Sequence, residues 1–151
     1  LTLVAVHLSP GDRGENPLHW PTAAPWTPQP QRMSLLVFAH PRCPCTRAAI
    51  RELAVVRARL NSECNIRVVF VKPPQATGDW EQTDIVRQAR ALSDIEVVWD
   101  ENGTAAELFG VKTSGHTLLY DAQGLLRFSG GITAARGHDG DNAGRGALIA
   151  R

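Results

Sequence analysis

The segment that most constrains the fold is an apolar strand followed at once by two cysteines and a helix. Ser34–Ala39 is a continuous apolar run rich in β-prone residues, which predicts a strand buried on both faces. Cys43 and Cys45 follow it in the sequence Cys-Pro-Cys. Apolar residues then recur at helical spacing over about 46–61, with arginines mostly between them. The pattern predicts a strand–turn–helix unit that carries two thiols where its helix begins.

The rest of the chain continues the alternation of strands and helices. The expected elements are a strand at Ile66–Val71, a helix capped by Asp79 or Thr83 and reaching about Leu92, a strand at Ile95–Trp99, a turn at Asp100–Gly103, a helix at Thr104–Phe109, a strand at Thr117–Tyr120, a hairpin turn at Asp121–Gly124, a strand at Leu125–Phe128, a loop from Gly130, and a last helix capped by Asp141 or Asn142. Strand–helix–strand units imply a parallel layer with right-handed crossovers, to which the hairpin adds antiparallel strands.

Composition narrows the function classes. The chain has 151 residues, 43% hydrophobic and 21% charged, which fits one globular domain. With 16 basic and 15 acidic residues the net charge is +1, so the chain lacks the basic surplus of nucleic-acid-binding proteins and we expect no nucleic-acid partner. Three cysteines are too few for a disulfide scaffold, and no apolar run approaches the ~18–20 residues of a membrane span.

The first part of the chain is expected to be an arm. Within the arm, residues 1–33, the stretch 9–32 holds a dense series of prolines, which excludes a helix and disfavours a central strand there. Trp20 and Trp26 are expected to pin this arm to a domain over 34–151, although a tryptophan–proline pair could also dock a partner. Leu1–Val6 is open to two interpretations, the tail of a signal peptide or membrane anchor, and an ordinary strand or frayed end.

Several motifs together resemble the thioredoxin superfamily. The strand, the Cys-Pro-Cys turn and the helix are one, the Gly-Val segment that leads into the strand at Thr117–Tyr120 is a second, and the closing hairpin with Gly130-Gly131 is a third. The additional helix and strand at 80–99 are similar to the extracytoplasmic thioredoxin-like branch, and His40–Thr46 with the glycine-rich stretch resembles a bacterial group called RedB. The resemblance implies an α/β, thioredoxin-like fold, with a central mixed sheet of about five strands flanked by helices.

The chain departs from the family pattern at two positions. In the family's Cys-x-x-Cys register, Arg42 occupies the first cysteine position, and Cys43 lies one place further in. His116 occupies the position of the family's cis-proline, which would bring a titratable nitrogen near the two sulfurs. Both departures bear on whether ordinary thioredoxin activity is retained.

The position of the cysteines predicts reactive thiols. Unpaired N–H groups and the helix dipole favour a thiolate at a helix N-terminus, and Arg42 adds positive charge. Side chains two residues apart in a helix point about 200° apart, so Cys43 must lie outside the helix if it is to bond to Cys45. The ring that such a disulfide closes is small, and strained disulfides are easily reduced, which favours a labile redox couple over a structural bridge.

We therefore predict thiol–disulfide exchange without an organic cofactor, in the periplasm or another extracytoplasmic compartment. Cys43 is assigned as the attacking thiol and Cys45 as the resolving thiol, although the family register places Cys45 on the buried cysteine. Arg42, His116 and His138 are the predicted substrate-binding residues, and the partners are protein thiols or disulfides. The remaining cysteine, Cys64, follows the long helix and is expected to be a small buried hydrophobe.

Two binding functions are the alternatives. Cys43, Cys45 and His116 are a plausible ligand set for Cu(I) or Zn, similar to that of thioredoxin-fold copper chaperones of the Sco type. A degenerate thioredoxin-fold module that binds a partner through its arm is the other. His40 could tune the cysteines or make a structural hydrogen bond. The polar loop at 137–142 misses the calcium-binding EF-hand spacing, and helix capping accounts for it more simply.

Overall fold

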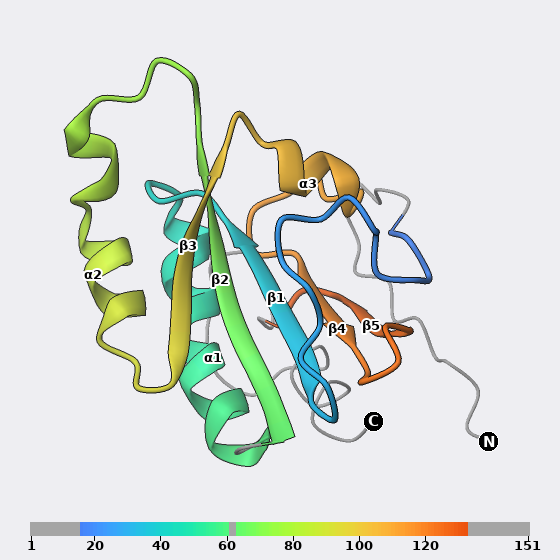
Figure 1. Ribbon diagram of the computed structural model, residues 1–151. Coiled ribbons are helices and arrows are strands. Elements are labelled where there is room, and N and C mark those ends of the chain that lie inside the picture. Colours follow the sequence, from blue (N-terminus) through green and yellow to red (C-terminus); the bar gives the residue numbers. More distant parts are fainter. Residues whose placement is uncertain (1–15, 61–62, 133–151) are drawn as a thin grey trace.

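A computed structural model describes residues 16–60 and 63–132 (Figure 1). Its strands are β1 (Met33–Ala39), β2 (Cys64–Lys72), β3 (Ile95–Glu101), β4 (Thr117–Tyr120) and β5 (Leu126–Gly130). Its helices are α1 (Pro44–Leu60), the 3-10 turn η2 (Gly78–Glu81), α2 (Asp84–Arg90) and α3 (Thr104–Leu108). The expectations for Leu1–Val6, His138 and the last helix lie outside the described residues.

The five strands form one mixed sheet in the order β3-β2-β1-β4-β5. β1 pairs in parallel with β2, which in turn pairs in parallel with β3. On its other side β1 pairs antiparallel with β4, and β5 closes the sheet as the second strand of a hairpin. β1 is thus the central strand and is buried from Ser34 to Ala39, which confirms the expectation from its apolar sequence.

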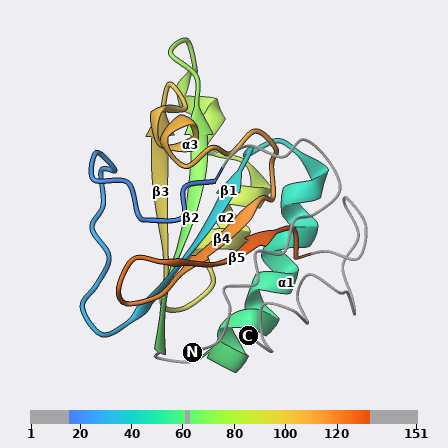
Figure 2. The ribbon, with the colours of Figure 1, turned by 90° about the vertical axis from the view of Figure 1, so that its right-hand side faces the viewer.

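Helices cover both faces of the sheet (Figure 2). α1 and α2 lie on one face, where Leu53 and Val86 pack against apolar residues of β1 and β2. α3 and the described part of the arm lie on the other face, where Phe109 belongs to a second cluster with Leu36 and Tyr120. The order of strands and the two layers of helices are those of a thioredoxin-like α/β fold, which confirms the predicted fold class.

The described part of the arm packs against the sheet. The ring of Trp20 meets Phe109 and Tyr120 edge-on, with centroids 5.2 Å from each. Its Nε1 donates to the Trp26 carbonyl oxygen at 2.9 Å, and the Arg67 guanidinium lies over the Trp26 ring. The two tryptophans therefore pin the arm to the domain, as the sequence predicts.

Several element boundaries differ from the expectations, and β2, for example, runs from Cys64 to Lys72 rather than from Ile66 to Val71. α1 begins two residues early because Pro44, which needs no N–H partner, suits the first helical position. β3 continues through Asp100 and Glu101, which pair with Val71 and Lys72, so the expected turn at 100–103 was wrong in its first half. β5 continues to Gly130 because that residue pairs with Thr117.

The helix expected to reach Leu92 is divided. η2 ends at Glu81, and α2 begins at Asp84 after Thr83, whose side chain accepts a hydrogen bond from the Val86 N–H and so caps the helix. Of the two expected caps, Thr83 is the one that serves α2. None of the helices in the described residues is both long enough and apolar enough to cross a membrane.

Candidate functional site

The two cysteines of the motif form a disulfide at the start of α1. Cys43 immediately precedes the helix, Cys45 lies in its first turn, and their Cα atoms are 5.3 Å apart, within the usual range for disulfides. Cys45 is buried, whereas Cys43 is partly exposed. Cys43 therefore lies outside the helix, as the direction of the side chains required.

The turn that carries the disulfide is held by backbone hydrogen bonds. The Cys43 N–H donates to the His40 carbonyl oxygen at 3.2 Å, and the Thr46 N–H donates to the Cys43 carbonyl oxygen at 2.9 Å. The motif thus leaves β1 through a tight turn and enters α1 directly. This places the disulfide at the carboxyl end of the central strand.

A pair of hydroxyls joins the start of α1 to the loop before β4. The fully buried Thr46 Oγ1 donates to the His40 carbonyl oxygen at 2.9 Å and lies 2.8 Å from Ser114 Oγ. Because the Thr46 hydroxyl already donates its single proton to the His40 carbonyl oxygen, the Ser114 hydroxyl is the donor in the second bond. Ser114 Oγ also accepts a hydrogen bond from the His40 N–H at 2.9 Å. The Ser114 carbonyl oxygen lies 4.0 Å from Cys45 Sγ, so this loop forms one wall of the disulfide site.

The side chain of His116 is engaged elsewhere. His116 is buried, and its Nε2 lies 2.8 Å from Ser129 Oγ on β5, while Ser129 Oγ donates to Asn16 Oδ1 of the arm. Ser129 gives its proton to Asn16, so His116 donates through Nε2 and is the Nε2-protonated tautomer. Burial lowers the pKa of His116 below its ordinary value.

The arrangement does not fit the metal-carrier alternative. His116 Nε2 is hydrogen-bonded to Ser129, and the two sulfurs of Cys43 and Cys45 are joined to each other in the disulfide. Among the described residues, no three His, Cys, Asp or Glu side chains gather in a way that could hold a metal ion. The role of His116 in substrate binding stays a prediction, as does that of His138.

An aromatic side chain that the sequence analysis did not select borders the motif. Trp80 of η2 meets the His40 ring edge-on at 5.0 Å, and the Arg42 guanidinium lies 5.1 Å from its centroid. Trp80 Nε1 donates to the Val71 carbonyl oxygen, and Thr83 Oγ1 donates to the Pro41 carbonyl oxygen, both at 2.8 Å. The segment between β2 and α2 therefore supports the turn.

One sequence signal could have identified Trp80. Trp80 follows the strand expected next to β1, and the carboxyl ends of parallel strands meet at one edge of the sheet, where the motif also lies.

His40 takes part in the turn that carries the disulfide. Its Nδ1 accepts from the Arg42 N–H at 3.1 Å, so His40 makes the structural hydrogen bond that was one of its two expected roles. Burial and the charge of Arg42 lower the pKa of His40. Arg42 itself is exposed beside the disulfide.

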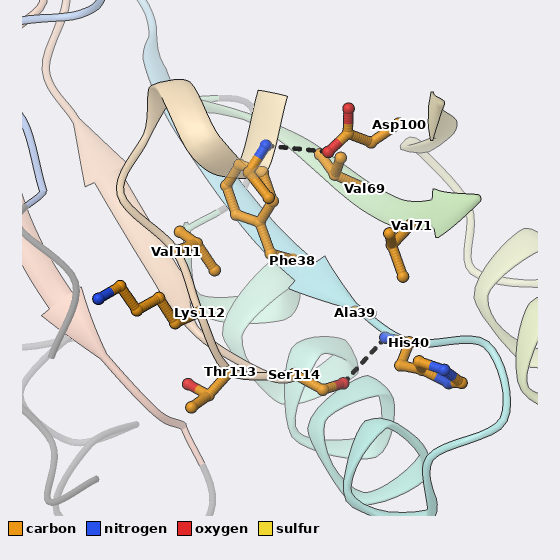
Figure 3. Close-up of a pocket in the computed structure, with 11 residues that line it drawn as sticks. Phe38, Ala39, His40, Val69, Val71, Asp100, Val111, Lys112, Thr113 and Ser114 are labelled. Carbon is orange, nitrogen blue, oxygen red and sulfur yellow. Dashed lines mark hydrogen bonds between the residues drawn. The ribbon is translucent and has the colours of Figure 1, made fainter. Parts of the chain in front are cut away.

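A cavity of about 250 Å³ adjoins the disulfide site (Figure 3). Its walls are mostly apolar and come from the ends of β1 and β2, from α3, and from the loop before β4. His40 and Ser114 belong both to this cavity and to the hydrogen bonds around the motif, so the cavity and the disulfide share a wall. Asp100 also lines the cavity, but its carboxylate accepts from the Ala105 and Ala106 N–H groups and caps α3.

Cys64 lies away from this site. It is the first residue of β2 and pairs with Met33 at the start of β1, whereas the motif follows the end of β1. The residue is 3% exposed, as expected for a cysteine that serves as a small buried hydrophobe.

Comparisons with known proteins identify the fold. No family model matches the chain, and no curated protein is significantly similar to it in sequence. The structure resembles a hypothetical protein of Sinorhizobium meliloti 1021 with a TM-score of 0.62 and 18% identity, covering 77% of this chain and 64% of that one. The chain thus spans about two thirds of the length of that protein.

Two further solved structures resemble the chain over most of its length. A secreted Mycobacterium tuberculosis disulfide oxidoreductase homologous to E. coli DsbE matches with a TM-score of 0.58 and 17% identity, over 81% of this chain and 84% of that one. StoA from Bacillus subtilis matches with a TM-score of 0.55 and 15% identity, over 74% of this chain and 84% of that one. The class defined here is a thioredoxin-like fold, similar to that of thiol–disulfide oxidoreductases. This chain has that fold and carries a Cys-x-Cys pair near the N-terminus of α1.

Proposed function

We propose that the protein is a thiol–disulfide redox protein that acts through Cys43 and Cys45. The observation that carries the proposal is the disulfide at the start of α1, in which one sulfur belongs to a partly exposed residue and the other to a buried one. A helix N-terminus stabilises a thiolate, and the guanidinium of Arg42 next to Cys43 adds to that effect.

The proposed exchange proceeds through a mixed disulfide. In the reduced protein the Cys43 thiolate attacks one sulfur of a partner disulfide, a new S–S bond forms, and the other partner sulfur leaves as a thiolate. The Cys45 thiolate then attacks Cys43 Sγ, which closes the Cys43–Cys45 bond and releases the second partner thiolate. The protein dithiol is oxidised by two electrons and the partner disulfide is reduced to two thiols, and the reverse sequence oxidises a partner dithiol.

We assign the attack to Cys43 because a partner must reach the sulfur of that residue. Its side chain is partly exposed, while Cys45 is 8% exposed and faces the Ser114 carbonyl oxygen. Cys45 can reach Cys43 without moving out of the helix, which suits a resolving thiol. Arg42, His116 and His138 are proposed to contact the partner.

We further propose that the partners are protein thiols or disulfides outside the cytoplasm and that the chain is a RedB-like member of the extracytoplasmic branch. The M. tuberculosis structure that it resembles is a secreted disulfide oxidoreductase, which supports this compartment. Disulfide exchange proteins that oxidise their partners work where disulfides persist, which is outside the cytoplasm.

Trapping of the mixed disulfide tests the proposal. We expect Cys45→Ser, produced in an extracytoplasmic compartment, to accumulate covalent adducts that reductant releases on gels, because the resolving thiol is missing. Cys43→Ser should accumulate none, and Cys64→Ser is the matched control, since Cys64 is buried at the other end of β1 and β2.

The pattern of adducts distinguishes the assignments. Adducts only with Cys43→Ser would reverse the two roles. Adducts with neither variant, together with no exchange by the wild type with 2-hydroxyethyl disulfide, would refute the proposed function.

A further inference from the structure

The cavity beside the disulfide has the size of a side chain. Its volume is about 250 Å³, while a cavity of about 150 Å³ holds benzene and pockets for whole drug-sized ligands run from about 300 Å³. There is room for one aromatic or large aliphatic side chain with part of its backbone. A nucleotide or other large cofactor would not fit.

The cavity has an apolar floor and an open mouth. Phe38 and Val69 are buried and form the floor together with Val111, as Figure 3 shows. At the mouth, Ser114 is partly exposed and Lys112 is exposed, so a side chain can enter from solvent. Burial of apolar surface in such a site is favourable, because the polar group of Asp100 already has its partners in α3.

The cavity adjoins the disulfide site, with Ser114 between the two. Ser114 lines the cavity while its carbonyl oxygen lies 4.0 Å from Cys45 Sγ, and His40 lines it two residues before Arg42. In an extended peptide, residues two apart point to the same side and span about 7 Å. A peptide whose cysteine reacts with Cys43 can therefore place the side chain two residues away in the cavity.

The charge around the cavity further restricts which peptide sequences we expect to bind. Lys112 at the mouth and Arg42 beside the motif are both exposed cations, and none of the ion pairs between described residues includes either of them. An acidic residue next to the apolar side chain would meet complementary charge, and a basic one would be repelled.

We propose that this cavity is a specificity pocket that takes an aromatic or large aliphatic side chain two residues from the reactive cysteine of an extended, acidic segment of the redox partner. The inference rests on the proposed function, and it assigns that function a substrate class. The covalent step is the exchange described above, with the partner cysteine as the sulfur that Cys43 attacks.

Peptide disulfides of one design test the pocket. The probes are acetylated, amidated peptides whose single cysteine is in a mixed disulfide with glutathione: Asp-Phe-Gly-Cys-Gly, Gly-Cys-Gly-Phe-Asp, and the versions with glycine in place of phenylalanine. The second-order rate constant for oxidation of the reduced full chain is measured with each probe and with 2-hydroxyethyl disulfide, which carries no side chain. We expect one phenylalanine probe to react about tenfold faster than its glycine partner, since that factor corresponds to partial burial of one aromatic side chain.

Two variants that fill the cavity should abolish the preference. Val71 is half-buried on β2 and Ala106 is half-buried on α3, and both line the cavity. Val71→Phe and Ala106→Leu should each reduce the phenylalanine-to-glycine rate ratio to within twofold of one. Two variants are used so that the test can still be made if one of them fails to fold. The matched control is Val55→Phe, because Val55 is exposed on α1 and lies outside the cavity, and it should keep the wild-type ratio.

Each outcome has a defined meaning. If the phenylalanine-to-glycine rate ratio of the wild type is near one while 2-hydroxyethyl disulfide reacts normally, the specificity pocket is refuted and the proposed function still stands. A ratio that persists in both filled variants also overturns the pocket, because the preference would then arise elsewhere. Failure of every disulfide, 2-hydroxyethyl disulfide included, refutes the proposed function and the pocket with it.

Discussion

At the scale of single residues, the buried imidazole of His116 makes stability depend on pH. Burial lowers its pKa in the folded state, whereas the unfolded chain keeps the ordinary value of about 6.5. Below pH 6.5 the unfolded chain therefore binds more protons than the folded one, and the free energy of unfolding falls as pH falls toward the lowered pKa. We expect a loss of at most about 1.4 kcal/mol for each pH unit in that window.

Substitution of His116 by glutamine isolates this effect. The glutamine amide can donate to Ser129 Oγ as the imidazole does, but it does not titrate. In His116→Gln the free energy of unfolding by urea, measured from pH 7.5 to 5.0, should vary less with pH than in the wild type. His40→Gln is the matched control, and because His40 is more exposed its removal should flatten the curve less. An identical slope in His116→Gln and the wild type would contradict the assignment of a neutral, buried His116.

The residue scale also shows what a sequence can and cannot predict about a site. The position of Cys43 outside the helix follows from the direction of side chains two apart, and the structure confirms it. The hydrogen bond between His116 Nε2 and Ser129 was not predictable, because Ser129 lies on a strand that follows later in the chain. Trp80 was missed for the same reason, since its contacts with His40 and Arg42 depend on how strands pair.

At the scale of elements, one hydroxyl pair joins α1 to the loop before β4. In Thr46→Val, Ser114 Oγ loses its buried acceptor, which should lower the free energy of unfolding by about 1–3 kcal/mol. Urea titration measures the change, and Thr104→Val at the exposed start of α3 is the matched control, with an expected change within about 0.5 kcal/mol.

A double-mutant cycle tests the pairing itself. The effects of Thr46→Val and Ser114→Ala should be non-additive by about 0.5 kcal/mol or more, because each removes the same bond. Strictly additive effects would show that the two hydroxyls act independently, against the proposed link.

Elements with strong periodicity were predictable, and their ends were less so. Strands β1 and β2 follow from continuous apolar runs, and the hairpin of β4 and β5 follows from the turn residues between them. The end of β3 was not predictable, because Asp100 is polar but is held by pairing with Val71 and by its bonds to the start of α3. Such long-range partners override the local preference of aspartate for turns.

At the scale of the whole molecule, the described part of the arm, from residue 16 onward, packs against the domain. The ring of Trp20 packs on Phe109 and Tyr120, and the backbone N–H of Trp20 donates to the Gly124 carbonyl oxygen. Tyr120 Oη donates to the Pro17 carbonyl oxygen. This described part of the arm therefore packs on the same face of the sheet as α3.

Removal of the Trp20 side chain measures that contribution. We expect Trp20→Ala to lower the free energy of unfolding by about 3 kcal/mol, the lower end of the range for tryptophan, because the side chain is only half-buried. Leu18→Ala is the matched control: Leu18 is 60% exposed, and the change should stay within about 0.5 kcal/mol. Equal small changes in both variants, measured by urea titration, would mean that the arm contributes little to stability.

The central claim is that Cys43 and Cys45 form one reversible redox couple, and equilibration in glutathione buffers tests it most directly. The full chain is equilibrated at graded ratios of reduced and oxidised glutathione, alkylated, and weighed by mass spectrometry. The account predicts two populations, with either one or three of the three cysteines alkylated under denaturing conditions, which interconvert in a single two-electron transition while Cys64 stays reduced. Three free thiols at every ratio, or stable attachment of one glutathione to Cys43 without closure of the Cys43–Cys45 bond, would contradict it.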